Sequence, residues 1–173
     1  MSINTVLPAA PPAKSALARY RLLSPTASIR VSPLCLGGMS FGTEWTDYSK
    51  SGPQPIPSDT SLIIVVGACD QETTESILDH FYSQGGNFID TSANYQFEQS
   101  EKWIGEWMKK RGVRDQMVVA TKFTTNFHGG KGDREIIANF GGNGAKSLHL
   151  TVQASLEKLQ TSYIDLVKAP PPL

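Results

Sequence analysis

The sequence predicts an α/β fold in which helices cover a parallel sheet, because strand-like and helical segments alternate along its 173 residues. The strand-like segments are short apolar runs, and the segments between them repeat apolar residues at helical spacing. Polar residues follow directly after several of these runs. After an initial hairpin the order is β-α-β-α-β-α-β, an alternation that joins parallel strands by right-handed crossovers.

The first elements are short strands. Two β-like pieces, 20–23 and 28–31, flank Ser24-Pro25-Thr26-Ala27, which predicts a hairpin ahead of the main fold. A strand over 34–36 follows. It ends at Gly37-Gly38, where the backbone can turn tightly or let a ligand approach closely.

The first helix is expected to begin after Asp70, which serves as its N-cap, and to stop at Gly85-Gly86. It leads directly into a strand that contains Phe88. Its apolar residues recur at helical spacing and predict an amphipathic helix. They are Ile77, Leu78, Phe81 and Tyr82.

The second helix ends at Gly112, after a basic last turn (109–111) in which cations suit the helix dipole. One of its faces is apolar, and two tryptophans on that face are expected to pack against the sheet. The face consists of Trp103, Ile104, Trp107 and Met108. A strand over 117–121 follows this helix.

The third helix shows one apolar stripe, which predicts its buried face. The stripe consists of Leu148, Val152, Leu156 and Leu159. The segment 140–147 only loosely resembles a phosphate-binding loop, and we interpret it as the turn that opens this helix. The last strand is predicted over 163–167.

Two architectures contain such a parallel sheet, the doubly wound fold and the (β/α)8 barrel. A doubly wound nucleotide-binding fold should carry GxGxxG after its first strand, and the segment 36–42 does not. A complete barrel needs eight strands and about 250 residues. The sequence therefore predicts the N-terminal half of a (β/α)8 TIM barrel, preceded by a short β-hairpin.

Composition and charge narrow the function. The 16 Lys and Arg residues balance the 16 Asp and Glu residues, so neither a nucleic acid nor a membrane surface is an expected partner. The longest apolar run, 61–69, falls far short of the roughly 20 residues that a membrane helix needs. The two cysteines, Cys35 and Cys69, lack metal-type spacing, which indicates a reducing, cytoplasmic setting.

Three polar residues lie at the carboxyl ends of predicted strands or just after them: Asp90, Tyr95 and Lys122. An ammonium beside a phenol stabilises the phenolate, and a carboxylate compensates the buried ammonium. Together they predict a tyrosine that can donate or accept a proton. Such a group suits reversible carbonyl reduction, a reaction in which a nicotinamide cofactor supplies the hydride.

Five segments of the chain resemble the aldo-keto reductase superfamily. The most similar branch is the fungal aryl-alcohol dehydrogenase and norsolorinic acid reductase group, which includes reductases of polyketide and meroterpenoid (austinoid-type) gene clusters. The matching segments are Leu36-Gly37-Gly38-Met39-Ser40-Phe41-Gly42, the run from Gly85 to Tyr95, Val119-Ala120-Thr121-Lys122, Lys146-Ser147-Leu148, and the run from Leu159 to Leu166.

This resemblance implies NADP(H) as cofactor, bound at the carboxyl ends of the barrel strands, and a small-molecule carbonyl or alcohol as substrate. The family's tetrad implies Tyr95 as proton donor, with Asp90 and Lys122 as catalytic partners. Asp90, Gly38 and Met39 would also contact the cofactor. We expect NADPH-dependent reduction of an aldehyde or ketone, or the reverse oxidation, in fungal secondary metabolism.

The chain departs from the family in two places. Pro170 stands where the tetrad histidine is expected, within an aberrant Pro-rich tail at 168–173. An atypical insertion at about 49–66 is foreign in composition, and a translated intron is our hypothesis for its origin. We therefore expect a flexible leader (1–18) and a truncated half barrel (19–167) with little activity. The alternative is a non-catalytic remnant that serves as an interaction module.

The three histidines, His80, His128 and His149, have no second ligand at metal spacing. We interpret them as surface or packing residues. No metal site is expected.

Overall fold

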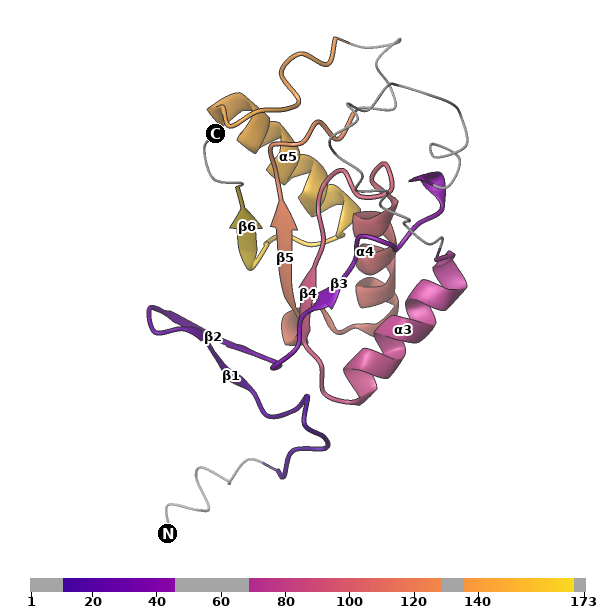
Figure 1. Cartoon of the computed structure of the whole chain (residues 1–173), viewed down its shortest axis with the longest axis vertical. Helices are drawn as coiled ribbons and strands as arrows, with labels where there is room; N and C mark the ends of the chain where they lie inside the picture. Colours follow the sequence, from indigo (N-terminus) through magenta and orange to yellow (C-terminus); the bar gives the residue numbers. More distant parts are fainter. Residues whose placement is uncertain (1–10, 46–68, 129–135, 170–173) are drawn as a thin grey trace, which may run out of the picture.

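The computed structural model describes residues 11–45, 69–128 and 136–169 (Figure 1). The proposed insertion at 49–66 and Pro170 lie outside these residues. In chain order the elements are β1 (Arg21–Ser24), β2 (Ala27–Val31), β3 (Leu36–Gly37), α3 (Gln71–Ser83), β4 (Phe88–Asp90), α4 (Gln99–Arg111), the 3-10 helix η1 (Arg114–Gln116), β5 (Val118–Lys122), α5 (Ala145–Lys158) and β6 (Leu166–Lys168).

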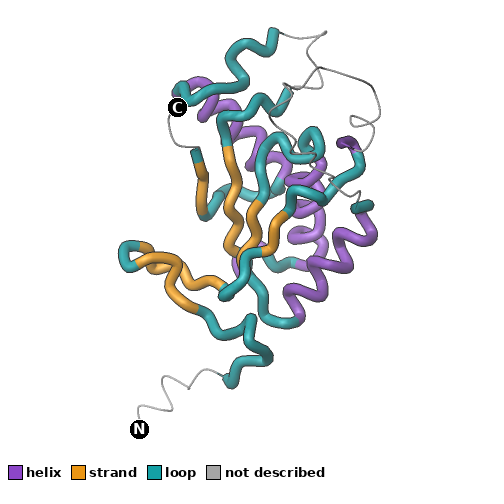
Figure 2. The backbone as a smooth tube through the Cα atoms, viewed as in Figure 1, coloured by secondary structure: helices purple, strands orange, loops and turns teal. Residues whose placement is uncertain are grey.

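The central sheet has four strands in the order β3-β4-β5-β6, and every pair is parallel. Helices α3, α4 and α5 lie on one side of it, as the path of the tube in Figure 2 makes clear. Because the strands follow one another in chain order with helical crossovers, this arrangement is the first half of a (β/α)8 barrel. The predicted fold class is confirmed.

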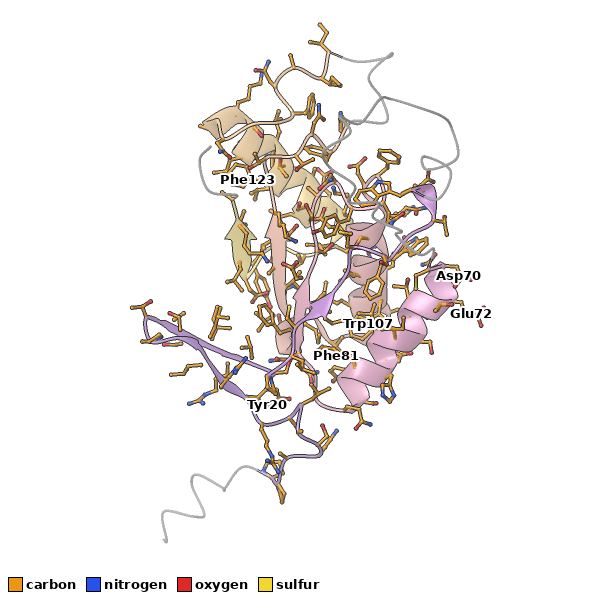
Figure 3. The ribbon with its side chains drawn as sticks, in the orientation of Figure 1. Tyr20, Asp70, Glu72, Phe81, Trp107 and Phe123 are labelled. Atoms are coloured by element: carbon orange, nitrogen blue, oxygen red, sulfur yellow. The ribbon has the colours of Figure 1, made fainter. Side chains whose placement is uncertain are left out.

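The N-cap of α3 was predicted correctly. The Asp70 carboxylate accepts a hydrogen bond of 2.8 Å from the Thr73 N–H, and this contact lowers the pKa of Asp70 (Figure 3). Leu78 and Phe81 are buried, whereas Ile77 is partly exposed. The buried apolar face of α3 is therefore narrower than the one predicted from the sequence.

The four apolar residues predicted for the buried face of α4 are all buried. Trp107 is fully covered between the helices, where its indole N–H donates to Asp79 at 2.8 Å (Figure 3). The ring meets Tyr82 edge-on at 6.1 Å. Gly112 ends the helix in the left-handed conformation, at φ 65°, as expected of a C-terminal glycine.

The hairpin β1–β2 lies apart from the central sheet. Its turn is tighter than predicted, since Ser24 and Ala27 pair with each other across it. Asn87 ties the hairpin to β4: its side chain accepts from the Ser32 N–H at 2.7 Å and donates to the Arg30 carbonyl at 3.0 Å. Within the expected leader, Ser15 donates to the Gln84 carbonyl at 2.6 Å.

Two strand boundaries differ from the prediction. The third strand is 36–37 rather than 34–36, and Leu34 is exposed. The last strand is 166–168 rather than 163–167, because the Asp165 carboxylate itself binds β5. It accepts from the Val119 N–H at 2.9 Å and from the Arg114 guanidinium at 2.8 Å.

The buried face of α5 also differs from the prediction. Leu148 is partly exposed, and the buried stripe consists of Ser147, Thr151, Ser155 and Leu159. The end of α5, at Lys158 and Leu159, approaches the backbone of α4 closely at Gly105. A Cβ on Gly105 would lie 2.6 Å from the Leu159 Cα. Among the described residues, no helix is both long and apolar enough to cross a membrane.

Candidate active site

The structure brings the three predicted residues together around the Lys122 ammonium. Lys122 Nζ lies 2.6 Å from Asp90 Oδ2, 2.9 Å from the Tyr95 hydroxyl and 2.9 Å from the Thr91 carbonyl. Asp90 and Lys122 are the last residues of β4 and β5, and Tyr95 lies in the loop after β4. The site therefore forms at the carboxyl ends of two neighbouring parallel strands.

The Lys122 ammonium is held in its charged form. Burial opposes the charge, but hydrogen bonds to Asp90 and Tyr95 outweigh this effect, so the pKa of Lys122 is raised. Its side chain is 29% exposed. A positively charged group thus lies against the tyrosine hydroxyl.

A second lysine, expected from the sequence to lie in an aberrant tail, shares the Asp90 carboxylate. Lys168 belongs to β6, is in register with Lys122, and forms an ion pair with Asp90 Oδ1. Residues in register on adjacent strands point to the same face of a sheet. The two ammoniums therefore flank one carboxylate, and the sequence did not reveal Lys168 because its position depends on the register of β6.

The loop that carries Tyr95 has a strained backbone. Gln96, Phe97 and Glu98 all have positive φ, at 53°, 46° and 81°. Non-glycine residues in this conformation cost free energy and persist only when their surroundings hold them. The buried Gln96 side chain provides one restraint, since it accepts from the Trp45 N–H at 2.9 Å and donates to the Met39 carbonyl at 3.1 Å.

Trp45 forms part of the wall beside the tyrosine. Its ring meets the Tyr95 ring edge-on, with centroids 6.0 Å apart. Sequence reasoning missed both Trp45 and Gln96, because each depends on contacts between segments about fifty residues apart in the chain.

Gly38 and Met39, the other candidate cofactor residues, lie at the end of β3. The Gly38 N–H donates to the Asp90 carbonyl at 2.7 Å, and its carbonyl accepts from the Ser100 hydroxyl at 2.8 Å. A Cβ on Gly38 would lie 3.0 Å from Ser100 Oγ, so α4 packs closely on this glycine and a side chain here would make its neighbours shift. Gly37, which pairs with Asp90, has open space where its side chain would be.

The first turn of α4 fastens three strands of the sheet. The Ser100 hydroxyl contacts the Gly38 carbonyl and, at 2.8 Å, the Thr91 hydroxyl. Glu101 next to it is fully buried and accepts from the Thr121 hydroxyl at 2.6 Å. These contacts hold the carboxyl ends of β3, β4 and β5 at fixed separations.

The remaining candidates stay outside the site. His80 and His149 are exposed, and His128 stacks on Phe140 with ring centroids 4.2 Å apart. Across the described ranges, no group of His, Cys, Asp and Glu could hold a metal ion.

The Cys35 thiol has a raised pKa, chiefly because the surrounding protein desolvates it in part and secondly because the Asp90 charge lies nearby. Segment 140–147 leads into α5 through Gly144, its N-cap, as predicted.

Sequence comparison assigns the chain to a known family. The model of the aldo/keto reductase family matches residues 33–169, and the chain belongs to that family. It is 52% identical over 151 residues to norsolorinic acid reductase B of Aspergillus parasiticus, covering 87% of this chain and 35% of that protein. It is 47% identical over 158 residues to the aldo-keto reductase ausK of Emericella nidulans, covering 91% and 35%.

Among solved structures, the fold is also similar to that of aldo-keto reductases. The holo form of an aldo-keto reductase from Bacillus halodurans superposes with a TM-score of 0.59 at 24% identity, over 87% of this chain and 39% of that one. The chain spans about a third of the length of these two curated relatives, 35% of both norsolorinic acid reductase B and ausK.

Proposed function

We propose that this chain carries the acid–base part of a cytoplasmic, NADPH-dependent aldo-keto reductase of fungal secondary metabolism. Its substrate is an aldehyde or ketone, and the reverse reaction oxidises the alcohol. The observation that carries the proposal is the chain of contacts from Asp90 through the Lys122 ammonium to the Tyr95 hydroxyl. The family match and the fungal relatives support the reaction class.

In this proposal Tyr95 donates its hydroxyl proton to the carbonyl oxygen of the substrate as the carbonyl carbon receives a hydride. The Lys122 ammonium stabilises the phenolate that remains, because an opposite charge at hydrogen-bond distance favours the ionised form. Asp90 compensates the partly buried Lys122 and keeps it protonated. In the reverse direction the phenolate takes the proton from the alcohol.

NADPH, when bound, supplies the hydride. The open space beside Gly37, next to Asp90 on the same pair of strands, fits the approach of a planar ring to this edge of the sheet. Asp90 and Met39 would hold the cofactor there. Gly38 would contribute through the tight turn that it allows rather than through free backbone groups, since both of its backbone groups are already bonded.

For the 173-residue chain alone we propose weak NADPH binding and slow turnover. The described sheet has four strands, whereas a complete barrel has eight. The position expected for the tetrad histidine holds Pro170. The alternative of a non-catalytic interaction module is therefore an outcome of the same experiment.

The test is reduction of an aryl aldehyde by the purified chain, followed by the loss of NADPH absorbance, together with calorimetric titration of NADPH. Tyr95→Phe should lower turnover by roughly 10²-fold or more, because it removes the proton donor. Tyr20→Phe, at an exposed position next to the hairpin, is the matched control and should leave turnover unchanged. A folded chain that neither binds NADPH nor turns over substrate would favour the non-catalytic alternative.

A further inference from the structure

The last residue of α5, Lys158, reaches into the loop that carries Tyr95. Its Nζ donates to the Ala93 carbonyl at 3.0 Å and lies 3.3 Å from Glu98 Oε1. It also lies 2.9 Å from Glu101 Oε2, as an ion pair without the orientation of a hydrogen bond. Its side chain is only 13% exposed, so these contacts replace most of its hydration.

The contacts of Lys158 lie on both sides of Tyr95 in the sequence. Ala93 precedes the tyrosine and Glu98 follows it, and the left-handed residues 96–98 lie within this span. The Ala93 N–H donates to the Lys122 carbonyl at 3.3 Å, so this residue joins Lys158 to the strand that carries Lys122. A strained loop needs such restraints to keep one conformation.

Glu101 connects the same lysine to the strand itself. Its carboxylate is fully buried, accepts from the Thr121 hydroxyl, and faces Lys158. Thr121 immediately precedes Lys122 in β5. A buried carboxylate needs a positive partner, and removal of that partner would leave an uncompensated charge beside Thr121.

We propose that Lys158, paired with Glu101, is a positioning residue for the reaction: it holds the loop 93–98 so that the Tyr95 hydroxyl stays at hydrogen-bond distance from Lys122. It acts through the tyrosine, and no contact places it on the reacting atoms. The significance of this position rests on the proposed function. The restraint itself is a property of the fold and is tested without turnover.

The test is amide hydrogen exchange of the whole chain, compared between the parent and Lys158→Met. Amides of residues 93–98 should exchange about tenfold faster or more in the variant, because local opening no longer breaks the Lys158 contacts. Amides of Leu78 and Phe81 in α3 should change less than about twofold. The tyrosine ring signals, assigned with Tyr95→Phe, should shift in the same variant.

Two further substitutions separate positioning from general stability. Lys158→Arg keeps the charge and the donors, and should restore exchange in 93–98 to within about twofold of the parent. Lys102→Met, at an exposed position of α4, is the matched control and should change nothing. If Lys158→Met does not fold, Lys158→Gln, which retains a neutral donor for Ala93, takes its place in the comparison.

Unchanged exchange of the 93–98 amides would overturn the proposal. So would equal acceleration at every amide, since that result indicates a stabilising role alone. Full turnover by Tyr95→Phe would instead refute the proposed function, and the exchange result would still report whether Lys158 restrains the loop.

Discussion

The Lys122 ammonium donates a hydrogen bond to the Tyr95 hydroxyl over 2.9 Å, and the same nitrogen lies 2.6 Å from Asp90. The lysine is therefore the centre of the site, and the carboxylate and the phenol do not need to contact each other. A substitution of Asp90 should therefore affect the Tyr95 hydroxyl only by changing the charge of Lys122.

Asp90→Asn tests this relationship. The substitution removes the first of the two hydrogen bonds that raise the pKa of Lys122, while the burial that lowers it remains, so the pKa of Lys122 should fall. The measurement is titration of the lysine ε-methylene signals by NMR. Asp79→Asn, on α3, should leave the Lys122 titration unchanged. A Lys122 pKa that does not fall would show that Asp90 does not hold the charge.

The ion pair between Asp79 and Arg111 should make the free energy of unfolding depend on pH in the acid range. The hydrogen bond from Arg111 to the Asp79 carboxylate lowers the pKa of Asp79, burial opposes this effect, and the hydrogen bond from Trp107 lowers the pKa further. A carboxyl group whose pKa is lower in the folded chain stabilises the fold at pH values above its unfolded pKa of 3.8. This stabilisation is lost as the pH falls through the folded pKa.

Asp79→Asn should therefore be less stable than the parent at neutral pH, and the difference should disappear in strong acid. Because the carboxylate side chain is 43% exposed, we expect less than about 1 kcal/mol. Urea unfolding at both pH values measures the difference. Glu157→Gln, at an exposed position of α5, is the control. A difference that persists in acid would contradict the assignment.

Gly105→Ala should destabilise the packing of α4 against α5. The new Cβ would lie 2.6 Å from the Leu159 Cα, so the helices must separate, and we expect a loss of about 1–3 kcal/mol. Gly144→Ala is the matched control, because open space surrounds that position and its φ of −78° suits alanine, so only the cost of an alanine at an N-cap, about 1 kcal/mol or less, is expected. Urea midpoints measure both. Equal stability of the two variants would show that the close approach is not required.

Asn87→Ala should loosen the hairpin β1–β2 from the sheet. It leaves the Ser32 N–H, in a residue only 1% exposed, without its acceptor, which costs about 1–3 kcal/mol. Thermal unfolding measures the loss. Asn143→Ala, which removes an exposed contact with Thr124, should cost much less. A tolerated Asn87→Ala would mean that other contacts hold the hairpin.

The features predicted from the sequence are those that depend on local backbone or on the regular geometry of parallel strands. Asp70 caps its helix and Gly112 ends the next one because each acts on its own turn. Asp90 and Lys122 meet because the carboxyl ends of adjacent parallel strands lie side by side. Tyr95 follows β4 closely enough to reach them.

What could not be predicted depends on contacts between distant segments. The end of α5 packs closely on Gly105 of α4, and the face of α5 that is buried carries Ser147, Thr151 and Ser155, whereas Leu148 is exposed. Lys168 joins the site through the register of β6, which Asp165 shortens at its start. Gln96 and Trp45 form their contact across about fifty residues of chain.

The order of the strands in the sheet makes the two inner strands harder to detach than the two outer strands. Both β4 and β5 have a partner on each side, whereas β3 and β6 each have a single partner within the described sheet. Fraying begins at strands with one neighbour, since fewer hydrogen bonds must break there. Asp90 and Lys122 belong to the inner pair and Lys168 to an outer strand. On warming, the Lys168 ammonium should therefore leave the Asp90 carboxylate at a lower temperature than the Lys122 ammonium does.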